Sequence, residues 1–394
     1  MTEEPAAPPE YDLLRGNPKY ERVAELSKGA FGCVLLAKDK ETGANLALKF
    51  IPRGPEHINK YVEREIQNHI KLRHPHIIAL REVFLTQTHL VLAMEHAVGG
   101  DLFKYVSSRR GLSEDEARWF FQQLMIAVDY CHRMGVSSRD IKLENALLDG
   151  SPRPLIKLAD FGFSKDANDQ SAPTSRVGTP AYLAPEVISN RMGQVYDGKK
   201  ADVWSCGVLL YVMLLDRYPF RRPGDDLYGP NQKLNVMLQR ILVADYVFPE
   251  SKVLSPGARD LISRILVPDP NQRLPLQQIL SHPWFLEGLH PAALQFNDRL
   301  VEESRANQPS AEVLSEARLI VQEAAKISAA VAARPWEQGM PERQAALSGE
   351  ICDSLNSSLR GSVQDEGEDG EVSQQADERA SAVVSPLAMP TTQG

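Results

Sequence analysis

The chain lacks the features of membrane, secreted and nucleic-acid-binding proteins. None of its apolar runs reaches the length of about 18 residues that a transmembrane helix needs. Its first residues are acidic and proline-rich, unlike a secretory signal, and position 2 is threonine, so N-myristoylation is not indicated. The net charge of −8 argues against a general nucleic-acid binder. We therefore expect neither a membrane nor a nucleic acid among its partners.

Cysteine is scarce as well. The 394 residues include four cysteines, and none of them has the spacing of metal ligands. This usage is typical of reduced thiols, which favours a cytoplasmic and nuclear location. Cys33 lies beside a glycine-rich loop, where it is either a small residue that fits the turn or a redox-sensitive thiol.

The order of secondary-structure patterns predicts an α+β fold of two lobes. Residues 1–19 contain four prolines and are expected to form a flexible N-terminal arm. Strand patterns dominate residues 20–96, interrupted by a helical pattern over residues 59–72, and helical patterns dominate residues 97–285. A β-rich N-lobe with one regulatory helix, followed by an α-helical C-lobe, predicts a cleft between the lobes.

Local patterns give more detail within the lobes. Residues 20–49 are typical of a strand–turn–strand unit, and residues 77–95 of two further strands. Ser113 and Glu116 have the spacing of a capping box, which predicts the start of a long helix through His132.

A second amphipathic helix is expected after the lobes, over residues 310–331, and a linker over residues 286–309 precedes it. Its apolar residues recur at helical spacing, so one face needs a covering surface. That face consists of Val313, Ala317, Ile320 and Ala324, with Leu314 and Val321 beside them.

Residues 332–394 are expected to form a disordered acidic tail. Residues 365–378 include seven acidic residues and no aromatic one, a composition that stays solvated. The tail is either an inert solubilising segment or a partner-binding one.

Two acidic motifs carry the strongest chemical signal. Asp140 and Asn145 frame a D-x-x-x-x-N segment, and a D-F-G tripeptide begins at Asp160 after a short β-like run. One carboxylate can accept a hydroxyl proton, while the other carboxylate and the amide can each hold a metal ion beside a nucleotide. Asp140 is thus a candidate base, and Asn145 and Asp160 are candidate metal ligands.

A phosphate cradle precedes these motifs. Residues 27–34 read S-K-G-A-F-G-C-V, and glycines at positions 29 and 32 let backbone N–H groups approach phosphate oxygens. The segment ending in Lys49 follows at the distance expected for a phosphate-binding lysine. We expect Glu65, on the next helix, to hold Lys49 by an ion pair.

The segment from Asp160 to Glu186 has the features of a regulated loop. A phosphate on a hydroxyl within it would add nearly two negative charges, which Arg139 could bind. Arg273 is a candidate partner for Glu186, and Asp202 is a candidate brace for the backbone of the catalytic loop. The hydroxyls concerned are those of Ser171, Thr174, Ser175 and Thr179, with Ser175 favoured.

Taken together and in this order, the motifs of residues 20–285 resemble a eukaryotic protein kinase, and Lys142 suggests serine/threonine specificity. The resemblance implies ATP and Mg²⁺ as cofactors and protein hydroxyls as acceptors. It implies catalytic roles for Asp140, Lys142, Lys49, Glu65 and Arg139. The nucleotide site is implied to consist of Leu26, Ser27, Lys28, Gly29, Ala30, Phe31, Gly32, Val34, Ala47, Lys49, Met94, Glu95, Ala97, Asp101, Asn145, Leu147 and Asp160, with Mg²⁺ on Asn145 and Asp160.

Further segments, among them residues 99–103, 143–151 and 177–186, resemble the second subfamily of plant SNF1-related kinases. That subfamily acts in osmotic-stress and abscisic-acid signalling. The resemblance implies that the second amphipathic helix packs on the regulatory helix of the N-lobe. It also implies a monomer that is activated by an upstream kinase or by autophosphorylation in trans, and a type 2C protein phosphatase as a tail-binding partner.

Three positions depart from the family pattern. Ser138 replaces the usual histidine of H-R-D, Ser27 replaces the first loop glycine, and Arg176 replaces one activation-loop acceptor. Ser138 keeps open an alternative, a weakly active pseudokinase or scaffold. A small-molecule kinase is a third reading, which the peptide-positioning segment around Pro180 disfavours.

Overall fold

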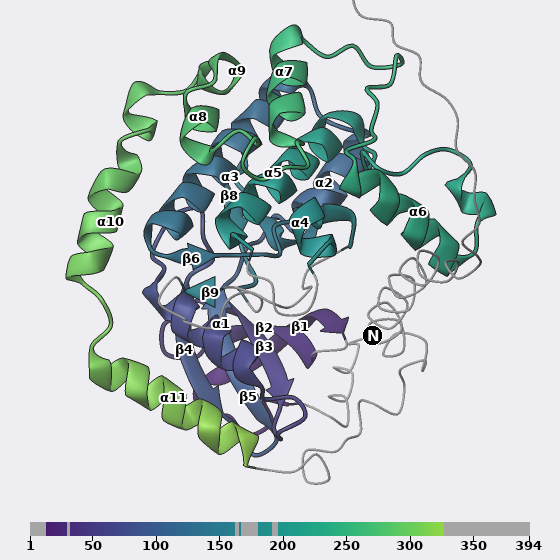
Figure 1. Ribbon diagram of the computed structural model, residues 1–394. Helices are drawn as coiled ribbons and strands as arrows, with labels where there is room; N and C mark the ends of the chain where they lie inside the picture. The colour runs from purple at the N-terminus through teal and green to yellow at the C-terminus, as the bar shows by residue number, and fades with distance from the viewer. Residues whose placement is uncertain (1–12, 30–31, 162–164, 167–179, 191–195, 327–394) are drawn as a thin grey trace, which may run out of the picture.

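The computed structural model has two lobes, with the sheet of the N-lobe below the helices of the C-lobe in Figure 1. It describes residues 13–29, 32–161, 165–166, 180–190 and 196–326. The predicted α+β class is confirmed, since a β-sheet and one helix precede an α-helical lobe. None of the helices in these ranges is both long and apolar enough to span a membrane.

The N-lobe is built on one antiparallel sheet with the strand order β1-β2-β3-β5-β4. The predicted strand–turn–strand unit contains three strands, because a second turn at Gly43 (φ +73°) reverses the chain again. The two strands expected at residues 77–95 are present. The strands are β1 (Tyr20–Gly29), β2 (Gly32–Asp39), β3 (Asn45–Pro52), β4 (Leu80–Leu85) and β5 (His89–Glu95).

The N-terminal arm is shorter than predicted. Leu14 is buried in the sheet's core, and the side chain of Asn17 accepts hydrogen bonds from the backbone of Lys19 and Tyr20. Burial of the Leu14 side chain and these hydrogen bonds oppose part of the entropy lost in ordering residues 13–19. Residues 1–12 lie outside the described ranges.

The helix α1 (Lys60–Lys71) forms where the helical pattern predicts it. Asn59 caps it by accepting hydrogen bonds from the N–H groups of Tyr61 and Val62, which satisfies donors that the first turn leaves unpaired. Glu65 and Ile66 lie on its buried face, and this face turns Glu65 toward β3.

The C-lobe is helical and surrounds α5, whose residues are apolar on nearly every side and almost all buried. Two short ribbons, β6 with β9 and β7 with β8, lie at its border with the N-lobe. Their strands are β6 (Val136–Ser137), β7 (Ala146–Leu148), β8 (Ile156–Leu158) and β9 (Lys165–Asp166). The helices are α2 (Leu102–Arg109), α3 (Glu114–Arg133), α4 (Pro185–Ile188), α5 (Gly198–Leu215), α6 (Pro230–Leu242), α7 (Pro256–Ile265), α8 (Leu276–Leu280) and α9 (Pro283–Leu286).

The predicted capping box of α3 is half formed. The Ser113 hydroxyl accepts a hydrogen bond from the N–H of Glu116 at 3.2 Å. The Glu116 carboxylate instead accepts from the hydroxyl of Tyr105 at 2.6 Å, which ties α2 to α3. Ser113 therefore marks the helix start as predicted, while Glu116 makes a tertiary contact.

The predicted linker contains a helix, α10 (Phe296–Ala306), which runs along α3 at the edge of the C-lobe (Figure 1). Its buried residues are Asn297, Val301 and Ser304. They follow helical spacing, but two of the three are polar, so apolar periodicity does not detect the helix.

The second amphipathic helix is α11 (Ala311–Ala325), capped by Ser310, and it lies across α1, β4 and β5. Its position on α1 agrees with the family resemblance. Its buried face agrees with the predicted one at Ala317 and Ala324 and at the adjacent Val321, whereas Val313 is 46% exposed. Small residues at the contact allow the two helices to approach closely.

The C-terminal end of α11 is fixed to β3 and its turn. The Arg53 guanidinium is buried and donates to the carbonyl oxygens of Glu323 at 3.0 Å and Thr86 at 3.1 Å. The N–H of Gly54 donates to the carbonyl of Ala324 at 3.0 Å. These bonds satisfy helix-end carbonyls that would otherwise lack partners.

Packing of α11 is expected to support both stability and activity. Val321→Asp places a carboxylate in the apolar contact, so we expect the melting temperature to fall by at least about 4 °C and phosphate transfer to drop. Leu319→Asp is the matched control, because Leu319 is 62% exposed on the same helix. Equal melting temperatures and activities of the two variants, measured by calorimetry and peptide phosphorylation, would contradict this packing.

Three buried histidines make stability depend on pH. Burial lowers the pKa of His69 and His89 to about 4 and that of His74 to about 3. In the unfolded chain each takes up a proton near pH 6.5, so below that value the unfolded state binds more protons. We expect the free energy of unfolding to fall from about pH 6.5 toward pH 4, by at most about 1.4 kcal/mol per pH unit for each histidine.

Urea titrations at pH 7.5 and 5.5 measure this slope. His89→Leu, which is remote from the cleft, should reduce it. A slope that is unchanged in the variant would show that His89 titrates normally in the folded chain.

Candidate active site

The ion pair predicted between Lys49 and Glu65 is present, with Lys49 Nζ 2.7 Å from Glu65 Oε1. Lys49 Nζ also lies 3.8 Å from Asp160 Oδ1. Burial opposes the charge of Lys49, but the two carboxylates outweigh it, so the pKa of Lys49 is raised. Burial raises the pKa of Glu65, an effect that Lys49 counteracts. The lysine thus enters the cleft as a cation.

The glycine-rich turn joins β1 to β2, where Ser27 pairs with Val34 and Gly29 with Gly32. Gly32 has φ +127°, and a Cβ there would lie 1.9 Å from the carbonyl oxygen of Phe50. Only glycine fits this position. The first loop glycine of the family pattern is not needed for the pairing, since Ser27 is an exposed β1 residue. Ala30 and Phe31 lie outside the described residues.

Several residues predicted to contact the nucleotide lie on strands of both lobes. Ala47 pairs with Met94 across β3 and β5, and Val34 faces Lys49 across β2 and β3. On the side of the C-lobe, Leu147 belongs to β7. Leu26 and Lys28, both on β1, are exposed. Ala97 follows β5 in the connection between the lobes.

Two of the predicted nucleotide contacts also have structural roles. Glu95 Oε2 accepts from the N–H of Ala79 at 3.2 Å, and its Oε1 lies 2.6 Å from Lys157 Nζ. Asp101 caps α2 by accepting from the N–H of Lys104 at 2.8 Å. Sequence reasoning missed both roles, which involve residues on other elements or in the next helical turn.

Asp140, Lys142 and Asn145 converge at the predicted catalytic position. Asp140 Oδ2 lies 2.7 Å from Lys142 Nζ and 2.9 Å from Asn145 Nδ2. Asn145 Nδ2 also donates to the backbone carbonyl of Asp140 at 2.9 Å. The carboxylate is buried and held in one orientation by charge-assisted hydrogen bonds.

Asp202 braces the loop that carries Asp140, as predicted from its position. Its carboxylate is buried and accepts from the N–H groups of Ser138 at 3.0 Å and Arg139 at 2.7 Å. His132 Nε2 lies 2.8 Å from the same carboxylate, a partner that sequence reasoning missed. Arg139 has φ +62°, a strained conformation for a non-glycine residue that these hydrogen bonds maintain.

Asn145 and Asp160 fit the divalent metal ions predicted for them. The two bonds of Asn145 to Asp140 use its amide nitrogen and not its oxygen, which is the atom that would bind a cation. The Asp160 side chain is 41% exposed, beside Lys49. Carboxylate and amide oxygens are hard ligands of the kind that Mg²⁺ prefers.

Phe161 is fully buried although Ser138 replaces the usual histidine. The His69 ring, on α1, lies 5.2 Å from the Phe161 ring, and His69 Nε2 lies 2.6 Å from the carbonyl of Ile78. Ser138 cannot fill the volume of an imidazole, and the imidazole of His69 from α1 packs against Phe161. Among the described residues, the buried Ser138 hydroxyl has no hydrogen-bond partner.

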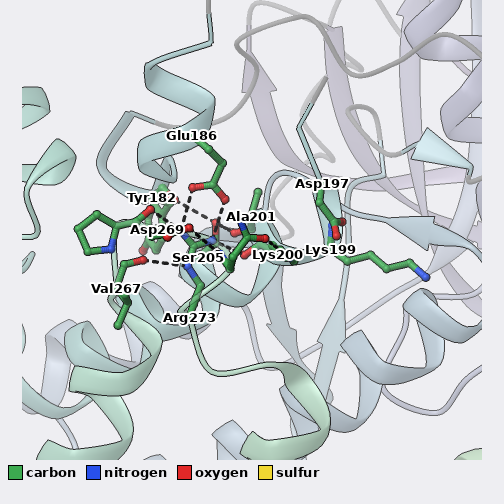
Figure 2. Close-up of polar contacts among 12 residues, drawn as sticks. Tyr182, Glu186, Asp197, Lys199, Lys200, Ala201, Ser205, Val267, Asp269 and Arg273 are labelled. Atoms are coloured by element: carbon green, nitrogen blue, oxygen red, sulfur yellow. Dashed lines mark hydrogen bonds and ion pairs between the residues drawn. The ribbon is translucent and has the colours of Figure 1, made fainter. Parts of the chain in front are cut away.

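Arg273 binds Glu186 through two parallel hydrogen bonds of 2.7 and 2.8 Å (Figure 2). Arg273 also donates to the carbonyl oxygens of Lys200 at 2.7 Å and Val267 at 3.2 Å. This predicted ion pair anchors α4, at the end of the regulated loop, to α5 and to the segment after α7. Breaking such a buried pair costs about 3–5 kcal/mol.

The predicted phosphoacceptors Ser171, Thr174, Ser175 and Thr179 lie outside the described residues. Arg139, the predicted phosphate ligand, is buried and its Nη1 lies 3.4 Å from the hydroxyl of Tyr196.

Comparison with known proteins now identifies the family. A model of the protein kinase domain matches residues 20–285. The chain belongs to the protein kinase family. It is 45% identical to the serine/threonine-protein kinase SRK2E of Arabidopsis thaliana, over 77% of this chain and 82% of that protein. It is 46% identical to SAPK3 of Oryza sativa, over 78% of this chain and 89% of that protein. SRK2A of Physcomitrium patens is 45% identical over 78% of this chain and 87% of its own length.

These relatives are serine/threonine-protein kinases, which agrees with the subfamily resemblance and with Lys142 beside Asp140. The kinase family implies ATP, a divalent metal ion and protein substrates. The alignments extend the likeness across most of the chain.

The contact between His69 and Phe161 is expected to support catalysis more than the hydroxyl of Ser138. His69→Ala leaves a cavity beside Phe161, so we expect turnover to fall about tenfold or more. Ser138→Ala removes a hydroxyl without a partner, so activity should stay within about twofold of the wild type. Initial rates of peptide phosphorylation at 15 °C compare the two variants, after circular dichroism has shown that both are folded at that temperature. A larger loss in Ser138→Ala would overturn the assignment.

Proposed function

We propose that this protein transfers the γ-phosphate of ATP to serine and threonine hydroxyls of proteins, in the presence of Mg²⁺. The observation that carries the proposal is the pairing of six charged or polar groups of the cleft. Lys49 is bound to Glu65 beside Asp160, and Asp140 is bound to Lys142 and Asn145.

Asp140 is proposed to orient the acceptor hydroxyl and to accept its proton. Lys142 Nζ, 2.7 Å from the Asp140 carboxylate, would hold the transferred group's negative charge on the side of the acceptor. Lys49 would hold phosphate oxygens on the side of the N-lobe. Its contact with Glu65 directs the ammonium group into the cleft before the nucleotide binds.

Mg²⁺ would be held by Asp160 and Asn145, where it would neutralise charge on the phosphates. The other phosphate contacts would come from groups of the chain itself. Backbone N–H groups of the glycine-rich turn would bind the phosphates. Gly32 in this turn has φ +127°, and a side chain there would meet the Phe50 carbonyl of β3, so the turn requires glycine at this position.

The pseudokinase reading is disfavoured. It depends on Ser138 alone, and Phe161 is buried against His69 despite that substitution. The small-molecule kinase reading is disfavoured by the anchored segment that ends at Glu186, because this segment positions peptide substrates in the family, and by the relatives' names.

The proposal includes regulation and setting. Phosphorylation at Ser175, by an upstream kinase or in trans by a second copy, would activate the enzyme, with Ser171 and Thr179 as further acceptors. Arg139 beside Asp140 would bind that phosphate. By resemblance to its subfamily, we propose a monomer, both cytoplasmic and nuclear, that acts in osmotic-stress or abscisic-acid-type signalling and is switched off by a type 2C protein phosphatase.

The experiment that tests the activity is phosphate transfer from labelled ATP by the purified full-length chain. With Mg²⁺ and a basic serine-containing peptide, we expect incorporation that Asp160→Ala reduces at least about 100-fold, because that variant loses a carboxylate held beside the phosphates. Peptide mapping then locates any autophosphorylation. Nucleotide binding without transfer, even after treatment with an upstream kinase, would favour the scaffold reading.

A further inference from the structure

The helix α10 lies beyond the residues that the kinase-family model matches, yet it reaches the junction of the two lobes. That junction is the loop between α1 and β4, residues 72–79, which we call the α1–β4 loop. The loop contacts the catalytic region directly. The N–H of Ile78 donates to the carbonyl of Leu158, and the N–H of Leu158 donates to the carbonyl of His76, each at 2.9 Å. Asp160 follows Leu158 by two residues.

Asn297, near the start of α10, is 3% exposed and connects three elements. Its side-chain nitrogen donates to the carbonyl of Ile126 and to the carboxylate of Asp129, both on α3 and each at 2.8 Å. Its side-chain oxygen lies 3.1 Å from His74 Nε2, on the α1–β4 loop. All the hydrogen-bonding groups of this amide are therefore directed at specific partners.

The direction of these bonds is determined by the ring of His74. The N–H of His76 donates to His74 Nδ1 at 3.0 Å, so Nδ1 is the acceptor and Nε2 carries the proton. Nε2 then donates to the Asn297 oxygen. A chain of hydrogen bonds thus runs in one direction from the loop backbone through His74 and Asn297 to Asp129 on α3.

Two further contacts from α10 act on the same loop. The ring of Phe296 packs edge-on against the ring of His74, with 5.7 Å between their centroids. The centroid of the Tyr130 ring, on α3, lies 4.9 Å from that of the same His74 ring. The hydroxyl of Tyr130 accepts from the N–H of Arg73 at 2.9 Å and lies 2.8 Å from the hydroxyl of Ser304 on α10. The loop is thus held between α3 and α10 by both polar and aromatic contacts.

We infer that Asn297 is a positioning residue, through which α10 clamps the α1–β4 loop to α3 and so sets the alignment of the two lobes for catalysis. The inference rests on the kinase reaction proposed above. Lobe alignment matters because Lys49 and Glu65 belong to the N-lobe, whereas Asp140 and Asn145 belong to the C-lobe. The loop is where the chain leaves the helix that carries Glu65.

Asn297→Leu in the full chain tests the inference. It keeps the approximate volume and removes the amide, which leaves His74 Nε2 without its partner. The Asp129 carboxylate then keeps its ion pair with Arg133, at 3.7 Å. The matched control is Val301→Ala, because Val301 is equally buried on the same helix but belongs to the C-lobe core. Both variants are assayed at a temperature at which both remain folded.

We expect Asn297→Leu to lower kcat/KM for ATP about tenfold, with a higher KM for ATP, since the nucleotide contacts both lobes. The KM for the peptide, which the C-lobe binds, should be unchanged. Val301→Ala should stay within about twofold of the wild type in each parameter even if its melting temperature falls as far. Hydrogen exchange at the N–H groups of Ile78 and Leu158 should accelerate in Asn297→Leu and not in the control.

A double variant separates positioning from stability. His74→Leu combined with Asn297→Leu removes the imidazole that Asn297→Leu leaves without a partner. The melting temperature should then rise part of the way back to that of the wild type, while kcat/KM stays low. Recovery of kcat/KM together with stability would overturn the inference. So would kinetics and exchange in Asn297→Leu equal to those of Val301→Ala.

Should Asn297→Leu fail to fold, Ser304→Ala tests the same clamp through the hydroxyl of Tyr130. The expected loss is about threefold in kcat/KM for ATP, with the same pattern of exchange. No change in either would contradict the inference. If the wild type is inactive, the proposed kinase reaction itself is contradicted. If the wild type is active and the variants show no change, only the positioning role of Asn297 is contradicted.

Discussion

The ion pair between Lys49 and Glu65 is the constraint on which the arrangement of the N-lobe depends. Its two charges belong to β3 and α1, so a separation of 2.7 Å requires the helix to lie against the sheet. Removing two charges from water costs several kcal/mol, which their attraction offsets only in good geometry. The pair therefore persists only while α1 is held in place. The contacts that hold it include α11 on its outer side, Phe161 against His69, and the α1–β4 loop at its end.

The C-lobe half of the site is held by a different kind of interaction. Asp202 fixes the backbone of the catalytic loop through short hydrogen bonds, and Asp140 is in turn bonded to two neighbouring side chains. These bonds lie within one lobe, so they form without a shift of one helix against another. Packed helices, by contrast, can shift by small translations. The geometry of the site therefore divides into a fixed C-lobe half and an N-lobe half that depends on helix packing.

How far the sequence predicts this structure depends on the kind of signal. The pairs of Lys49 with Glu65 and of Arg273 with Glu186 were predictable, because their spacing accompanies ordered motifs. The helix α10 was not, because Asn297 and Ser304 are polar residues whose burial depends on hydrogen-bond partners far away in the chain. The buried face of α11 was predictable from its apolar periodicity at Ala317 and Ala324, whereas the exposure of Val313 was not. Likewise, nothing local indicates that His69 covers Phe161.

The end of α11 has a mechanical consequence for the N-lobe. Arg53 and Gly54 bind the last carbonyls of the helix, so the last described turn of α11 lies beside the strand that carries Lys49. A displacement of this helix end would have to break those hydrogen bonds at the end of β3. The position of α11 is thereby coupled to the strand from which the ammonium group enters the cleft.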